Sequence, residues 1–122
     1  HAMIKTIYRV DGLYFYNRFF DPRVNFWKNL IENAISSRIL RNPLDSITLA
    51  KQVIYLFIGS NQEWARGAIS IDQMRSEIGY GISLLLLPFS CKNFIEFLHE
   101  KLDRFGSDLE VYRKIGPIPN AC

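Results

Sequence analysis

The sequence has few residues of the kinds that hold metal ions. It contains two cysteines and two histidines, and His1 belongs with Ala2 to a dipeptide before Met3 that is typical of the remnant of an expression tag. The remaining histidine and the two distant cysteines form no pair at helical spacing, and no CxxC or HExxH motif is present. Phosphate-binding glycine loops are missing too. We therefore expect neither a metal site nor a cofactor.

The two cysteines, Cys91 and Cys122, are too few for a disulfide framework. Cys122 is the last residue of the sequence, where chains are usually loose, so we expect no structural disulfide bond. A low cysteine content without a disulfide bond is typical of the cytoplasm or another reducing compartment. The first residues also lack the long apolar run of a signal peptide, and none is predicted.

Long hydrophobic runs are absent. The longest apolar stretches, Val53–Ile58 and Ile82–Phe89, are far shorter than the roughly 20 residues that a membrane-spanning helix needs. Hydrophobic residues still make up 48% of the chain and charged residues 22%, as in soluble globular proteins. A chain of 122 residues supports one hydrophobic core. We expect a single domain over residues 1–122, with residues 117–122 as an extended tail.

The segment Ile47–Ile58 is predicted to be a central buried helix. Its polar residues form one narrow stripe at helical period: Thr48, Lys51, Gln52 and Tyr55. Apolar residues occupy the rest of the circumference, so other elements must cover this helix. Asp45 or Ser46 can cap its start, and Gly59 predicts its end.

The other helices are predicted from capping residues, apolar periodicity and helix-stopping residues. They are a helix from Asp21-Pro22, with Asp21 as N-cap, to Asn42-Pro43, a short helix from Ser60, and three segments: Ile71–Leu87 with Ser70 as cap, Cys91–Phe105 with Ser90 as cap, and Ser107–Ile115. Gly79 and Gly81 each cost about 1 kcal/mol inside a helix relative to alanine, which predicts that another backbone approaches closely there. A short strand over Ile82–Leu87 is the competing assignment, because periodicity cannot decide so short a run.

An N-terminal β-hairpin is predicted from Ile4–Val10 and Leu13–Phe19, which flank Asp11-Gly12. An Asp-Gly pair between β-branched and aromatic runs is the strongest short-range hairpin signal. A two-stranded hairpin is marginal alone, so it has to rest on the helices or on a partner. The expected fold is mainly α: a small single-domain helical bundle of four or five helices around the central helix, with this hairpin against it.

The segment Tyr8–Trp27 favours protein binding. It holds eight of the seventeen aromatic residues, interleaved with arginines, and residues 1–42 carry seven Lys or Arg against three acids. Aromatic residues and arginine dominate binding hot spots, and a basic region attracts an acidic surface. We expect a non-catalytic adaptor or inhibitor that binds a partner protein, either a second copy in a homodimer or a different chain. The expected binding residues are Tyr14, Tyr16, Arg18, Phe20, Arg23 and Trp27.

Two alternatives stay open. The same segment suits nucleic acid, because rings stack on bases and arginines contact phosphates. However, the net charge is only +3 and no RNP-like pattern is present. The other alternative is a small enzyme with Cys91 as nucleophile, since a helix N-terminus favours the thiolate. His99 lies eight residues further on, too far to take the thiol proton directly.

Overall fold

The computed structural model describes residues 16–42 and 45–115, and these residues are mainly helical. The elements are the π-helical turn η1 (Tyr16–Phe20), the helices α2 (Asp21–Ser36), α3 (Ser46–Ala65) and α4 (Ile71–Leu86), the 3₁₀ turn η2 (Leu87–Phe89) and the helix α5 (Lys92–Ile115). The described ranges contain no strand, only an isolated antiparallel bridge between Leu40 and Ser90. The mainly α class is therefore confirmed. Most of the expected hairpin lies outside the described residues, and its last part, from Tyr16, belongs to η1.

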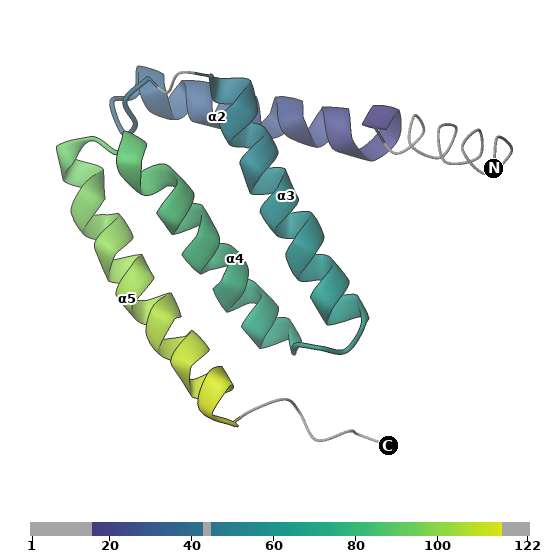
Figure 1. Ribbon diagram of the computed structural model, residues 1–122. Helices are drawn as coiled ribbons and strands as arrows, with labels where there is room; N and C mark the ends of the chain where they lie inside the picture. Colours follow the sequence, from purple (N-terminus) through teal and green to yellow (C-terminus); the bar gives the residue numbers. More distant parts are fainter. Residues whose placement is uncertain (1–15, 43–44, 116–122) are drawn as a thin grey trace, which may run out of the picture.

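The helices α3, α4 and α5 lie side by side in one layer, and α2 runs across one end of it (Figure 1). Each helix packs mainly on its neighbours along the chain, so α3 lies between α2 and α4. The core cluster gathers at the α2–α3 contact: Phe20, Val24, Ile31, Leu40, Leu49, Ala50 and Ile54. The polar stripe expected on α3 faces outward, since Thr48, Gln52 and Tyr55 are exposed.

The helix α3 continues through Gly59, where the sequence predicted its end. Gly59 faces open space and keeps a helical backbone, whereas Gly67 has the left-handed φ of +76° that follows the helix end. Ser60 was expected to start a new helix, but it is buried on α3 seven residues after Val53, on the same face. Continued packing of this face outweighs the local stop signal.

The helix α5 also runs through a predicted boundary, at Gly106 and Ser107. Apolar residues recur at spacings of four and three across that point: Leu98, Leu102, Phe105 and Leu109. This face packs against α4, so one long helix buries more apolar surface than two short ones. Ser90, expected to cap α5, instead donates its hydroxyl to the Leu86 carbonyl over 2.8 Å and satisfies the end of α4.

The helix α2 is shorter than expected at its C-terminal end. It stops at Ser36 instead of Asn42, because Arg38 adopts a left-handed backbone with φ of 59°. The reversal returns the chain toward the helix, and the amide of Ile39 donates to the Ala34 carbonyl over 2.9 Å. Asp21 is the first residue of α2 and not its N-cap, since η1 leads directly into the helix.

The helix α4 confirms the helical assignment of residues 71–86 and excludes the strand over Ile82–Leu87. Its two glycines do admit close neighbours, but these are side chains and not another backbone. A Cβ atom at Gly79 would lie 2.5 Å from the Phe105 ring, and one at Gly81 would lie 2.6 Å from a methyl carbon of Leu56. Glycine thus lets α5 and α3 insert side chains against opposite flanks of α4.

The connectors after α2 and before α5 are joined at one end of the layer. Besides the Leu40–Ser90 bridge, the amide of Cys91 donates to the Ile39 carbonyl over 2.9 Å. The Arg41 guanidinium also donates to the Pro88 carbonyl. These bonds fix the end of the layer over which α2 lies.

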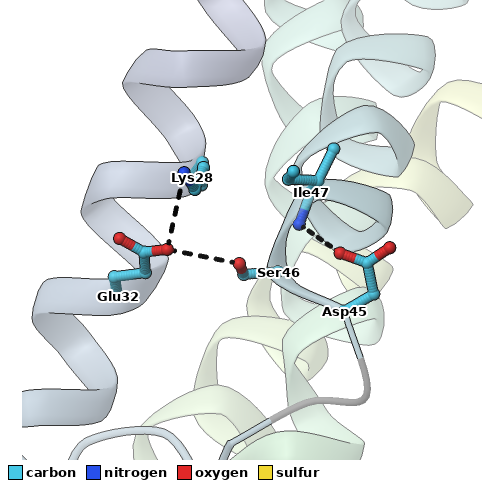
Figure 2. Close-up of polar contacts among 5 residues, drawn as sticks. All are labelled: Lys28, Glu32, Asp45, Ser46 and Ile47. Carbon is cyan, nitrogen blue, oxygen red and sulfur yellow. Dashed lines mark hydrogen bonds and ion pairs between the residues drawn. The ribbon is translucent and has the colours of Figure 1, made fainter.

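The start of α3 is capped as expected by Asp45. Its carboxylate accepts the amide of Ile47 over 3.0 Å, and the Ser46 hydroxyl reaches across to Glu32 on α2 over 3.5 Å (Figure 2). Glu32 also pairs with Lys28 over 3.8 Å. In residues 16–42 and 45–115, no helix has the length and hydrophobicity needed to cross a lipid bilayer.

Candidate functional site

An apolar groove of about 540 Å³ lies between η1–α2 and α3. We call it the aromatic groove, because five of its described lining residues are aromatic. The described residues that line it are Phe19, Phe20, Arg23, Phe26, Trp27, Ile54, Phe57, Ile58 and Asn61. Its volume is in the range of ordinary ligand sites, and it is open to solvent along one side.

The floor and the rim of the aromatic groove differ in burial. Phe20 is 4% exposed and belongs to the core, and its ring stacks on Tyr55 with centroids 5.8 Å apart. On the rim, Phe19 is 46% exposed and Phe26 is 59% exposed. The Trp27 ring lies 6.0 Å from the Phe26 ring and 5.9 Å from the Phe57 ring of α3, measured between ring centroids. The groove therefore has a fixed aromatic floor and open aromatic edges.

Helical spacing explains the rim. Phe19, Arg23, Phe26 and Leu30 follow one another at intervals of four, three and four, which places them along one side of η1–α2. The buried residues Val24 and Ile31 occupy the neighbouring face. Since α2 crosses the end of the layer, its rim side stays uncovered by the described helices next to it.

Arg23 is the one charged residue among the described residues that line the aromatic groove. Its guanidinium donates to the Phe19 carbonyl over 3.0 Å and lies 5.5 Å from the centre of the Phe19 ring. These two contacts hold the cation at the groove edge in a defined position. No described lining residue is acidic, so the groove presents one oriented positive charge on an apolar surface.

A second hollow of about 230 Å³ continues along α2 and reaches α4 and α5. Trp27 lines both hollows, and the described lining of the second one carries no charge. From Phe19 to Ala34, the two hollows follow fifteen residue steps of η1–α2, which is about 22 Å at helical rise. A ligand helix of about four turns has this length.

The six residues expected to bind a partner are only partly brought together. Arg23 and Trp27 line the aromatic groove, Phe20 forms its buried floor, and Arg18 is exposed in η1. Tyr14 lies outside the described residues, and Tyr16 is placed in η1 without a described side chain. Sequence reasoning missed Phe26, although its spacing of seven from Phe19 was a signal for a shared face. It also missed Phe57, since nothing local indicates that α3 packs on α2.

Cys91 stands at the connector between η2 and α5 and is partly buried. Its amide is bound to Ile39, and its carbonyl accepts the amides of Phe94 and Ile95. His99 is exposed further along α5. Within the described ranges, no three His, Cys, Asp or Glu side chains come together as a metal site.

Comparison with protein-family models, with curated proteins and with solved structures returns no match for this chain. Its chemistry is therefore inferred from the site itself. The aromatic groove offers a large apolar area, a buried floor and one oriented guanidinium. Such a surface can bind an apolar side chain that lies next to a negative charge.

Proposed function

We propose that the protein is a non-catalytic interaction module, an adaptor or inhibitor, that binds an acidic amphipathic helix of a partner protein in the aromatic groove. The observation that supports this most directly is the open aromatic rim above a buried floor. Exposed apolar side chains next to one another are uncommon on proteins that act alone and are typical of binding sites. Groove binding of an amphipathic helix is a recurring recognition mode.

The shape of the two hollows supports a helical ligand. Their combined length of about 22 Å along α2 matches about fifteen residues of helix. Large side chains at positions i, i+4 and i+7 of the ligand would lie along its buried side. Trp27, shared by both hollows, would contact the middle one.

The charge of the groove supports an acidic ligand. Arg23 is held at the edge by Phe19, and its guanidinium suits a carboxylate geometrically. Arg18 is exposed in η1, directly before α2, and adds positive potential near Arg23. An aspartate or glutamate next to the apolar anchors of the ligand would pair with Arg23.

A displayed library of random peptides of about sixteen residues, selected against the whole protein, tests this proposal. Enriched peptides should carry large apolar residues at helical spacing together with acidic residues. Fluorescence anisotropy should show affinity falling about tenfold or more in Phe26→Ser, which removes the most exposed rim ring. Arg23→Glu should cause a similar loss, because it places like charges together.

Leu84→Ser is the matched control for the rim variants. Leu84 is an exposed apolar residue of α4 outside the aromatic groove, so peptide affinity should not change. Circular dichroism should show unchanged helicity in all three variants. The proposal is wrong if the enriched peptides bind Phe26→Ser and Arg23→Glu as tightly as the parent protein, or if acidic residues are not enriched.

A further inference from the structure

The helix α5 lies at the edge of the helical layer and packs on α4 along one side (Figure 1). Another of its sides carries exposed side chains, with one half-buried lysine among them, at intervals of four and three over most of its length. We call this row the α5 seam: Phe97, Lys101, Arg104, Asp108, Val111 and Ile115. Alternating intervals of four and three are the pattern by which two long helices pack against each other.

The α5 seam is apolar at its two ends. Phe97 is 47% exposed near one end, and Val111 and Ile115 are 55% and 69% exposed near the other. The Lys101 ammonium lies 5.2 Å from the centre of the Phe97 ring, so its aliphatic stem follows the same surface. The seam extends over eighteen residue steps, or about 27 Å.

Charges of both signs occupy the middle of the seam. Arg104 and Asp108 are exposed, and the ion pairs found in residues 16–42 and 45–115 are Lys28–Glu32 and Arg75–Asp72. Neither Arg104 nor Asp108 therefore has an ionic partner within the described chain. Both charges are available to another molecule.

The order of these residues is symmetric about Gly106. In an antiparallel pair of α5 helices related by a two-fold axis at this position, Phe97 faces Ile115 and Lys101 faces Val111 of the other copy. Arg104 then faces Asp108, and this ion pair forms twice. The end residues Phe97 and Ile115 form an apolar pair, the central residues form ion pairs, and the aliphatic stem of Lys101 lies opposite Val111.

We infer that the protein forms an antiparallel homodimer through the α5 seam. The second copy is the occupant because the charges of the seam are complementary to themselves, and apolar ends meet apolar ends. This interface lies on a different surface from the aromatic groove and does not depend on it.

Sedimentation equilibrium over about 5–500 µM protein, with reductant present, tests the dimer. The parent protein should associate reversibly to two copies. Arg104→Asp should weaken association about tenfold or more, because two aspartates then face each other. Asp108→Arg should do the same by opposing two arginines.

Two experiments that restore opposite charges at the facing positions distinguish this antiparallel geometry from other modes of association. The double variant Arg104→Asp with Asp108→Arg should dimerise again, since each pair is only reversed. An equimolar mixture of the two single variants should form a heterodimer, because all facing charges are then opposite. Glu96→Arg, an exposed change on α5 outside the seam, should leave association unchanged.

A parent protein that stays monomeric at the highest concentration would overturn the inference. So would single charge variants that dimerise as well as the parent, or a mixture of them that does not associate. Helicity by circular dichroism should be the same for all variants, since each changed side chain is exposed. Loss of peptide binding by Phe26→Ser should occur without any change in the dimer.

Discussion

The aromatic groove and the α5 seam expose comparable apolar side chains but differ in shape and in charge. The groove is concave, and its described lining carries a single arginine. The seam lies on one side of a helix and carries both signs of charge at mirrored positions. A surface with one sign of charge needs a partner of different chemistry, whereas a self-complementary surface fits its own copy. Exposed apolar area alone would not have separated these two cases.

Removal of the floor of the groove should have the largest effect. Phe20→Ala should lower the free energy of unfolding by about 3–5 kcal/mol, because it deletes a buried ring from the α2–α3 core. Phe19→Ala, at the adjacent exposed rim position, should cost less than about 1 kcal/mol. Urea denaturation measures both. Equal losses would mean that floor and rim are not distinct.

A substitution on α4 should displace α5 without changing any described residue that lines the aromatic groove. Gly79→Ala should lower the free energy of unfolding by about 1–3 kcal/mol, since the new Cβ atom would lie under 3 Å from three carbons of the Phe105 ring. Peptide binding in the aromatic groove should be retained, because neither Gly79 nor Phe105 is among the described residues that line the two hollows.

The control for this substitution is Gly59→Ala. Gly59 lies inside α3 with no atom near its Cβ position, so alanine should stabilise the protein by about 0.5–1 kcal/mol through helix propensity. The two glycines should therefore give changes of opposite sign in the same urea experiment. A stabilising Gly79→Ala would contradict close packing of α4 on α5.

The smallest effect is expected at Asp45, which belongs to neither surface. The Thr48 hydroxyl, which donates over 2.7 Å, and then the Ile47 amide lower the pKa of this carboxyl below its usual value. Its stabilising effect is thus complete above the unfolded-state pKa near 4, and is lost as the pH falls through the lower folded-state value.

Asp45→Asn isolates this titration, because asparagine also caps helices but carries no charge. The melting temperatures of parent and variant should differ slightly at pH 7, and the difference should shrink as the pH falls through the lowered folded-state pKa of Asp45. Peptide binding and dimerisation at neutral pH should stay as in the parent. A difference that grows toward acid would have the wrong sign for a lowered carboxyl pKa.

Local capping signals predicted some helix boundaries and failed at others. Asp45 and Ser70 cap α3 and α4 as expected, and the Ser70 hydroxyl accepts the Gln73 amide over 3.1 Å. Similar signals at Ser60 and Ser107 do not start helices. There the apolar face continues past the signal, and packing between helices outweighs a cap of about 1 kcal/mol.

The candidate site was predictable only where it depends on local sequence. Arg23 and Trp27 were expected from composition and lie in the groove. Phe20 was expected on the surface for the same reason, but it forms the floor because α2 packs across α3. The opposite wall, with Ile54 and Phe57, depends on a contact between segments about thirty residues apart in sequence, which no periodicity encodes.

The bridge between Leu40 and Ser90 joins the connector after α2 to the connector before α5, so these two connectors should unfold together. The amide of Cys91 and the carbonyl of Ile39 belong to different connectors, so neither connector can detach while the other keeps its bonds. Helices α2 and α5 are thereby released together at this end, whereas the turn between α3 and α4 at the other end can fray by itself. Opening this end of the fold therefore requires both connectors to separate at once, whereas the α3–α4 turn, whose amides at Arg66, Gly67 and Ala68 bond back to α3, can open independently of them.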